Sequence, residues 1–168
     1  MFPQMIVSFA LLLAAASMSA AGAIRTGEAE VRESGVGNPC FTISEREERR
    51  GGAPNFHSVT VYDTSKARAR LWTMSIAPER TFPVLYSMCI PYAGRVQALP
   101  KTPAAQLDTG KVYEEWIEAA AGNRKPDAPH SYSARFCLAK QRDGSIIVHH
   151  IDAGAHEGRH LYGCIVPK

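Results

Sequence analysis

The segments Val59-Thr60-Val61-Tyr62 and Leu71-Trp72-Thr73-Met74-Ser75-Ile76 decide the fold class, because apolar and polar residues alternate along both. Successive side chains of a β-strand point to opposite faces, so this alternation predicts strands with one buried face. Other short runs rich in β-branched and aromatic residues are separated by Gly, Pro and Asp. We expect strands at residues 40–43, 56–62, 69–76, 84–90, 111–119, 132–139, 145–151 and 161–166.

Residues 112–121 fit either a strand or a helix. Four of them fall at helical spacing, and the Glu-Glu and Ala-Ala-Ala-Gly sequences favour a helix and its end. However, Tyr113, Trp116 and Ile117 form strands more readily, and the neighbouring segments have strand patterns. We therefore predict a strand here.

The turn Gln141-Arg142-Asp143-Gly144 separates two of the expected strands. Asp-Gly supplies the positive φ angles of a type I′ turn, so we predict a hairpin of that type.

The stretch Leu107-Asp108-Thr109-Gly110-Lys111-Val112-Tyr113 has the spacing L-x-x-G-x-x-Y and leads into an expected strand. It resembles the tyrosine corner of immunoglobulin-like and fibronectin type III domains, in which the Tyr hydroxyl bonds back to the backbone upstream. We therefore expect an all-β fold, an immunoglobulin or fibronectin III-like β-sandwich of seven to eight strands with two disulfides.

The first 23 of the 168 residues have the pattern of a signal peptide. They contain no charged residue, carry an apolar run too short to span a bilayer, and end in Ala21-Gly22-Ala23. We expect cleavage near Ala21 or Ala23 and export to the periplasm or beyond. Residues 24–37 are polar and rich in Gly, and we expect a flexible tether there. Residues 38–168 then form one domain.

The four cysteines, Cys40, Cys89, Cys137 and Cys164, are even in number and widely spaced. In an exported chain this pattern predicts two disulfides, whereas metal sites use close pairs such as C-x-x-C. Of the three possible pairings we favour the one that joins neighbours in chain order, Cys40–Cys89 and Cys137–Cys164.

The charged residues, 19 Lys and Arg against 16 Asp and Glu, give a net charge of +3 and are spread along the chain. A nucleic-acid-binding protein would show a one-sided basic stripe, so we expect no nucleic-acid partner. The densest charged segment, Glu45–Arg50, mixes both signs, and we interpret it as a solvated loop.

The segment His156-Glu157-Gly158-Arg159-His160 matches the zinc-protease motif H-E-x-x-H. In that motif both histidines lie on one face of a helix of several turns. Gly154, Gly158 and Gly163 interrupt this segment and the chain ends soon afterwards, so we interpret the match as chance and expect no enzyme activity.

A metal site without a helix is the alternative for the same region. Four of the six histidines lie close together there, namely His149, His150, His156 and His160. His149 and His150 are adjacent and point to opposite faces of a strand, so at most one of them can join a cluster. We expect no metal and no other cofactor, with His156 and His160 as the alternative metal ligands.

The remaining candidates for chemistry favour structural roles. Glu114 and Glu115 are neighbours on opposite faces of a strand, so they do not form an acid–base pair. Trp72 and Trp116 lie within apolar runs, and core packing is expected for both. We expect no catalytic residue.

Four short pieces of the chain resemble a family of small periplasmic proteins, often lipoproteins, proposed as immunity proteins of type VI secretion systems. They lie in the same order across roughly residues 38–151 and are Asn38-Pro39-Cys40-Phe41-Thr42-Ile43, Cys89-Ile90-Pro91-Tyr92, Leu107-x-x-Gly110-Lys111-Val112-Tyr113 and Tyr132-Ser133-Ala134-Arg135-Phe136-Cys137-Leu138. The resemblance implies a Cys40–Cys89 pair. The signal region lacks the lipobox Cys of the lipoproteins, so we expect no membrane anchor.

This resemblance implies a binding protein without catalytic activity that covers the active site of a toxin. The expected contact segments are the loop 91–108 and the hairpin tip 152–160, with Tyr92, Arg95, His156 and Arg159 as candidate binding residues. The alternatives are a metal-binding secreted protein or enzyme that uses the His-rich C-terminal hairpin, and a structural accessory subunit of an envelope assembly.

Overall fold

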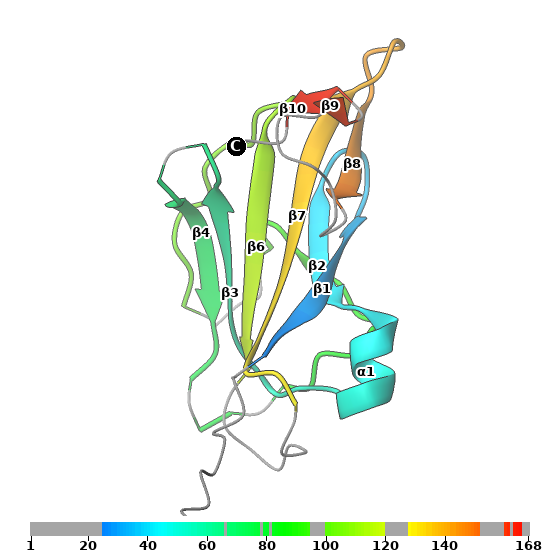
Figure 1. Ribbon diagram of the computed structural model, residues 1–168. Helices are drawn as coiled ribbons and strands as arrows, with labels where there is room; N and C mark the ends of the chain where they lie inside the picture. The colour runs from blue at the N-terminus through cyan, green and yellow to red at the C-terminus, as the bar shows by residue number, and fades with distance from the viewer. Residues whose placement is uncertain are drawn as a thin grey trace, which may run out of the picture.

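The computed structural model describes residues 25–65, 67–77, 79–80, 82–94, 100–119, 128–151, 160–161 and 163–165, and Figure 1 shows their arrangement. Strands dominate these residues and helix is scarce among them. In chain order the elements are β1 (Thr26–Glu33), β2 (Pro39–Ile43), α1 (Glu45–Gly51), β3 (Phe56–Asp63), β4 (Ala69–Ser75), β5 (Ile90–Pro91), β6 (Val112–Ala119), β7 (Ser131–Lys140), β8 (Ile146–Ile151), β9 (His160–Leu161) and β10 (Cys164–Ile165).

One curled sheet contains eight of these strands, in the order β4-β3-β6-β7-β1-β2-β5, with β8 also paired to β7. Residues 26–28 of β1 pair in parallel with residues 131–133 of β7, and β8 then pairs antiparallel with residues 135–140 along the same edge. At this point β1 diverges from β7, and β8 becomes the neighbour of β7 in its place. We call this point "the fork".

The all-β class is therefore confirmed, and the strand predicted at residues 111–119 is β6. The described strands form a continuous curled sheet together with the small β9–β10 pair, so an immunoglobulin-like sandwich is not confirmed.

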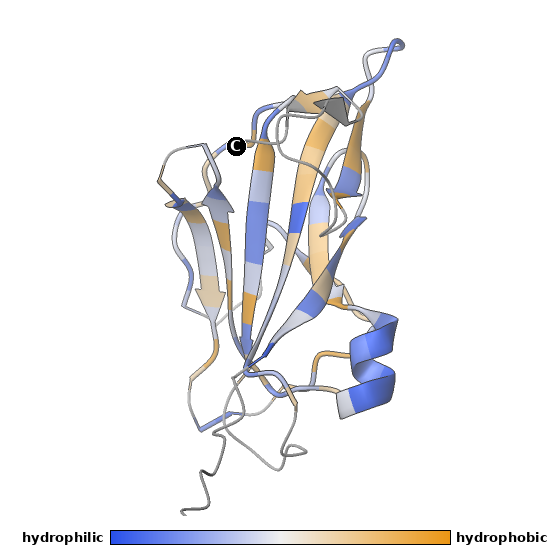
Figure 2. Cartoon of the chain, in the orientation of Figure 1, coloured by the Kyte–Doolittle hydropathy of each residue, from blue (hydrophilic) through white to orange (hydrophobic). Residues whose placement is uncertain are grey.

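The core lies on one face of the curled sheet, and aromatic rings fill its centre. The Phe41 ring lies 5.6 Å from the Phe136 ring and 6.4 Å from the Trp72 ring, between ring centroids. Hydrophobic residues alternate with hydrophilic ones along several strands, as Figure 2 shows, because one face of those strands is buried against this core. Trp72 is fully buried, as predicted.

The corner that leads into β6 has the predicted tyrosine-corner geometry. The Tyr113 hydroxyl accepts a hydrogen bond from the Asp108 backbone N–H at 2.7 Å and donates one to the Asp108 carbonyl at 3.2 Å. Gly110 has a φ of 82°, a conformation that glycine adopts without strain.

Both disulfides join the predicted pairs, with Cα–Cα distances of 5.3 Å for Cys40–Cys89 and 6.3 Å for Cys137–Cys164. Two such bonds indicate an oxidising, extracytoplasmic compartment. Within the described part of the chain, we find no helix with the length and apolar character needed to cross a membrane.

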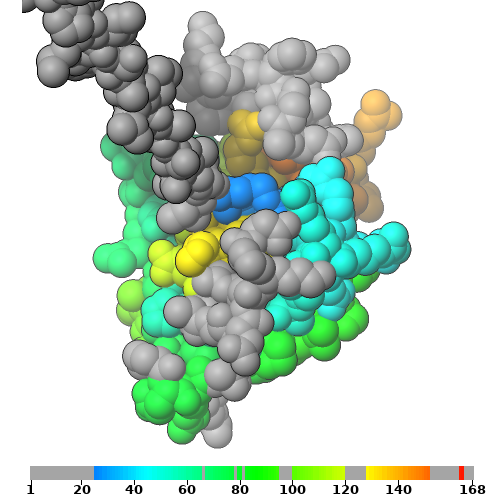
Figure 3. Space-filling view, turned by 60° about the horizontal axis from the view of Figure 1, so that its bottom comes forward, coloured from blue at the N-terminus to red at the C-terminus, as the bar shows by residue number. Residues whose placement is uncertain are grey.

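The segment Glu45–Arg50, predicted to be a solvated loop, instead forms most of helix α1. Ser44 caps this helix by accepting a hydrogen bond from the Glu47 N–H, and acidic residues precede basic ones in the order that the helix dipole favours. Glu47 is buried, and two hydrogen bonds from Arg25, at 2.6 and 2.8 Å, hold the pKa of its carboxyl below the usual range. Figure 3 shows α1 beside the start of β1.

The flexible tether predicted at residues 24–37 is wrong, because most of it forms β1. Gly27, Ala29 and Val31 are buried on one face of the strand, and charged residues alternate with them. The side chains on the buried face are small, so the strand has little of the β-branched and aromatic character that marks the other strands.

Two other strand predictions need correction. Only Ile90 of the predicted strand 84–90 belongs to a strand, because a turn closed by the Met88 N–H and the Leu85 carbonyl interrupts the segment. The predicted strand 161–166 is divided between β9 and β10, with Gly163 between them at a φ of 82°.

The hairpin between β7 and β8 is confirmed, but its turn is not of type I′. Gly144 has positive φ whereas Asp143 does not. The Gln141 carbonyl accepts from the Gly144 N–H, and the Ser145 carbonyl accepts from the Gln141 N–H. This is the three-residue loop in which a type I turn is followed by a left-handed glycine.

Candidate binding face

The binding residues predicted from the sequence do not gather at one place in the described structure. Tyr92 is only 7 % exposed, and its hydroxyl donates to the Ala105 carbonyl at 2.7 Å. Burial raises the pKa of Tyr92 to about 12. Tyr92 is therefore a core residue with a satisfied hydroxyl, which corrects its expected role as a contact residue.

The other predicted binding residues, Arg95, His156 and Arg159, lie outside the described residues. The backbone of His160 belongs to β9, so this end of the H-E-x-x-H segment is extended rather than helical. Across the described ranges, no three His, Cys, Asp or Glu side chains lie close enough together to hold a metal ion.

Part of the loop 91–108 has a structural role along the edge of β4. The Thr102 N–H donates to the Thr73 carbonyl at 2.9 Å, and the Ser75 N–H donates to the Pro100 carbonyl at 3.0 Å. These bonds satisfy backbone groups that an uncovered edge strand would present to other chains.

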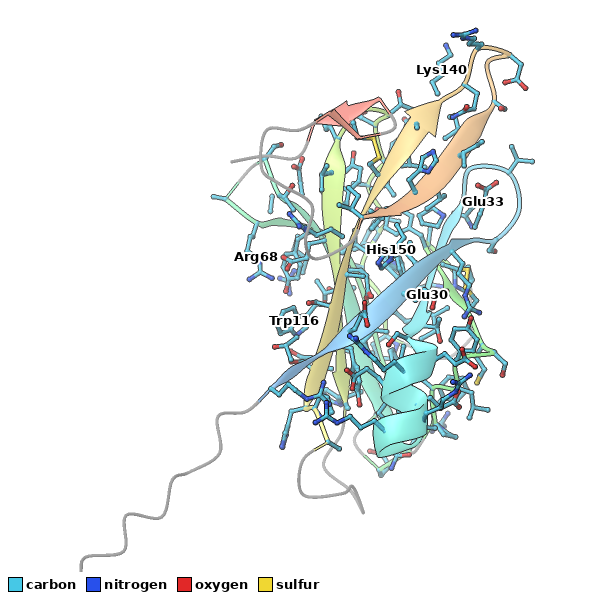
Figure 4. All side chains as sticks on the ribbon, turned by 45° about the vertical axis from the view of Figure 1, so that its right-hand side comes forward. Glu30, Glu33, Arg68, Trp116, Lys140 and His150 are labelled. Atoms are coloured by element: carbon cyan, nitrogen blue, oxygen red, sulfur yellow. A yellow bond between two sulfur atoms is a disulfide. The ribbon has the colours of Figure 1, made fainter. Side chains whose placement is uncertain are left out.

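The face of the sheet that points away from the core carries a cluster of one arginine and two aromatic rings. Tyr62 comes from β3 and Trp116 from β6, and both are partly exposed. The guanidinium carbon of Arg68 lies 4.9 Å from the centre of the Tyr62 ring and 5.7 Å from that of Trp116. We call these three residues the Arg68 cluster. Figure 4 shows Arg68 and Trp116 on the same side of the molecule.

The backbone before β4 positions Arg68 in this cluster. Ala67 and Arg68 both have positive φ, 47° and 57°, which is uncommon for residues other than glycine. Arg68 Nη2 is 2.7 Å from Glu114 Oε2, so an ion pair and two ring contacts hold the guanidinium. The Arg68 side chain nevertheless remains 55 % exposed and open to a partner.

The expectation that Trp116 packs in the core is wrong, and the alternation along β6 explains why. Trp116 lies at the same parity as Glu114 and Glu118, on the outward face, whereas Glu115 lies at the parity of Tyr113 and Ile117. The order of the residues in the segment 112–119 is sufficient to predict this parity.

Glu115 is fully buried in the core, and neither of its carboxylate oxygens has a hydrogen-bond partner among the described residues. The register places it between Val61 of β3 and Ala134 of β7. Burial, with a smaller contribution from the Glu114 charge, raises the pKa of Glu115 well above its usual range. Burial therefore favours the neutral form of Glu115, and its side chain lies in the core and not at a surface site.

The fork contains a hollow of about 190 Å³. The gap between β1 and β8 is closed by side chains, since the Val31 N–H donates to His150 Nδ1 at 3.3 Å and the Val148 N–H donates to Glu33 Oε2 at 3.0 Å. Figure 4 shows His150 and Glu33 in this region. The hollow, which we call the fork hollow, is lined by Glu28, Glu114, Ser133, Ala134, Arg135, His150 and Ile151.

The fork hollow adjoins the Arg68 cluster through Glu114, which lines the hollow and pairs with Arg68. The sequence analysis missed both sites. The parity of Ser131, Ser133 and Arg135 along β7 could have placed Arg135 on the outward face, but the fork depends on pairing between distant segments.

Comparison with family models, with curated proteins and with solved structures found no match to this chain.

Proposed function

We propose that this chain is an exported protein that binds another protein through the outward face of β3 and β6 and acts by covering its partner, without catalysis. The Arg68 cluster is the observation that carries the proposal. Trp, Tyr and Arg are the residue types most enriched at interface hot spots, and here all three are partly exposed within one patch.

The rigidity of this face supports the proposal. Tyr62 and Trp116 lie on two paired strands in the middle of the sheet, and the ion pair with Glu114 orients Arg68 before any partner arrives. Side chains that are ordered in advance lose less conformational entropy on binding, so more of the contact energy contributes to affinity.

The partner that we propose is a toxin acting in the periplasm, whose active site this protein occludes as an immunity protein. The signal-peptide pattern of residues 1–23 and the resemblance of four short pieces to type VI immunity proteins support this role. The two disulfides agree with folding in an oxidising compartment.

The test is a pull-down with the exported form, disulfides intact, against the lysate and secretome of its own species under toxin-secreting conditions. We expect one stoichiometric partner that is toxic in the periplasm when this protein is absent. Recovery of no such partner would contradict the immunity role.

Calorimetry with the isolated partner then tests the face. We expect Trp116→Ala and Arg68→Ala each to weaken binding by about thirtyfold or more, which is the size of a hot-spot effect. Arg142→Ala, in the exposed turn before β8, and Val36→Ala, in the exposed turn after β1, serve as controls and should leave affinity unchanged. Equal affinity of all four variants would place the interface elsewhere.

A further inference from the structure

We propose that the fork hollow binds a carboxylate group, with Arg135 as its main ligand. This inference does not depend on the proposed function, because a carboxylate would bind there whether or not the chain has a protein partner. The hollow combines an arginine that has no partner among the described residues with neutral hydrogen-bond donors.

The charge of Arg135 is balanced by no carboxylate in the part of the chain that the structure describes. Within the described residues its guanidinium makes no ion pair and no hydrogen bond. The two carboxylates that line the hollow already have arginine partners: Glu28 pairs with Arg46 and Glu114 with Arg68, each at 2.7 Å. A guanidinium presents parallel N–H groups that match the two oxygens of a carboxylate.

The tautomer of His150 follows from its backbone contact. Because Nδ1 accepts the Val31 N–H, the neutral imidazole must carry its proton on Nε2. The neutral ring therefore carries one N–H and no free acceptor, and His150 is one of the residues that line the hollow. The Ser133 hydroxyl, on the same face of β7 as Arg135, is a further donor in the lining.

The charges around the hollow select the kind of anion. Glu28 and Glu114 remain close to any bound group, so each additional negative charge on a ligand would be repelled by both. The volume of about 190 Å³ is sufficient for a carboxylate with a short carbon chain. A monocarboxylate is therefore favoured over phosphate or sulfate. The carboxylate could be a free small acid or an acidic side chain of a peptide.

The experiment is an NMR titration of the folded, oxidised protein that follows the Arg135 Nε–H and the His150 ring resonances. The probes are sodium acetate, sodium phosphate, and a capped peptide containing one Glu, compared with the same peptide containing Gln. We expect saturable shifts at both residues with acetate at millimolar concentration, and no saturation with phosphate or the Gln peptide.

Comparable affinity for acetate and the Glu peptide would identify a site for free acids, whereas at least tenfold tighter binding of the peptide would identify a site for an acidic side chain. Both outcomes support a carboxylate site. Arg135→Gln should weaken binding at least tenfold, and Arg142→Gln in the exposed turn should have no effect.

The proposal would be overturned by the absence of saturable shifts in the wild-type protein, which does not depend on how any variant folds. Phosphate binding as tight as acetate binding would overturn it as well, as would unchanged acetate affinity in a folded Arg135→Gln protein. Failure of these titrations would leave the pull-down result for the Arg68 cluster unaffected, so the two proposals fail separately.

Discussion

Glu115 is the residue whose environment conflicts most with its chemistry. A buried carboxyl group without a hydrogen-bond partner costs about 1–3 kcal/mol relative to an apolar group of similar shape. We therefore predict that Glu115→Met increases the free energy of unfolding at pH 7.5 by about 1–3 kcal/mol, as measured by urea unfolding. The exposed acid Glu79 supplies the control, and Glu79→Gln should change stability little. A loss of stability in Glu115→Met would show that the carboxyl group has a partner.

The same residue makes stability depend on pH in a direction that can be stated in advance. Because the pKa of Glu115 is raised in the folded state, the folded protein keeps this proton after the unfolded chain has lost it. Stability therefore falls as pH rises above the unfolded pKa of about 4.3, and levels off above the folded pKa.

Glu115→Gln removes this proton linkage. We predict that its stability relative to wild type is higher at pH 7.5 than at pH 4, as measured by urea unfolding at both values. A difference between the two proteins that does not change with pH would contradict the raised pKa.

At the scale of elements, β1 is the strand whose presence most changes the expected architecture. Gly27 lies against Tyr132 of β7, and a Cβ built on Gly27 would lie 2.4 Å from Tyr132 Cδ1. The Tyr132 ring is buried and cannot yield easily.

We predict that Gly27→Ala destabilises the protein by about 1–3 kcal/mol, the usual cost of overpacking, as measured by its thermal midpoint. Gly35→Ala, in the turn after β1, serves as the control, because no atom lies within 4 Å of the added Cβ. Unlike Gly27, Gly35 has a positive φ, so this substitution also strains the backbone. Its cost should come from the backbone alone and be smaller. No effect of Gly27→Ala would indicate that residues 24–37 are a tether after all.

Most of the fold that can be predicted from the sequence follows from the alternation of apolar and polar residues along single strands. It identified β3, β4, β6 and β7, and the Leu107–Tyr113 spacing identified the corner. The same alternation places Trp116 on the outward face and Glu115 on the buried face, whereas residue type alone favours the opposite arrangement. The placement of Arg68 could not be predicted, because it requires two left-handed residues and contacts with β3 and β6.

At the scale of the whole molecule, the two disulfides attach the irregular segments to the sheet. Cys40–Cys89 ties β2 to the segment before β5, and Cys137–Cys164 ties β7 to β10, on the outward face beside Val112 and Ile151. Each closes a long stretch of chain, with sequence separations of 49 and 27 residues. Sheet packing alone leaves these segments with few strand pairings, so the disulfides should account for much of the stability.

In the chain-entropy description, closing loops of these lengths contributes about 4 and about 3.5 kcal/mol, a large fraction of the roughly 5–15 kcal/mol of a typical domain. We predict that reduction shifts guanidinium unfolding, followed by tryptophan fluorescence, by an amount equivalent to about 7.5 kcal/mol. Fully buried Trp72 reports on the core. The control is the oxidised protein with all other solution conditions matched. An unchanged midpoint after complete reduction would show that the sheet is stable without its disulfides, and the export requirement inferred from them would lose its physical basis.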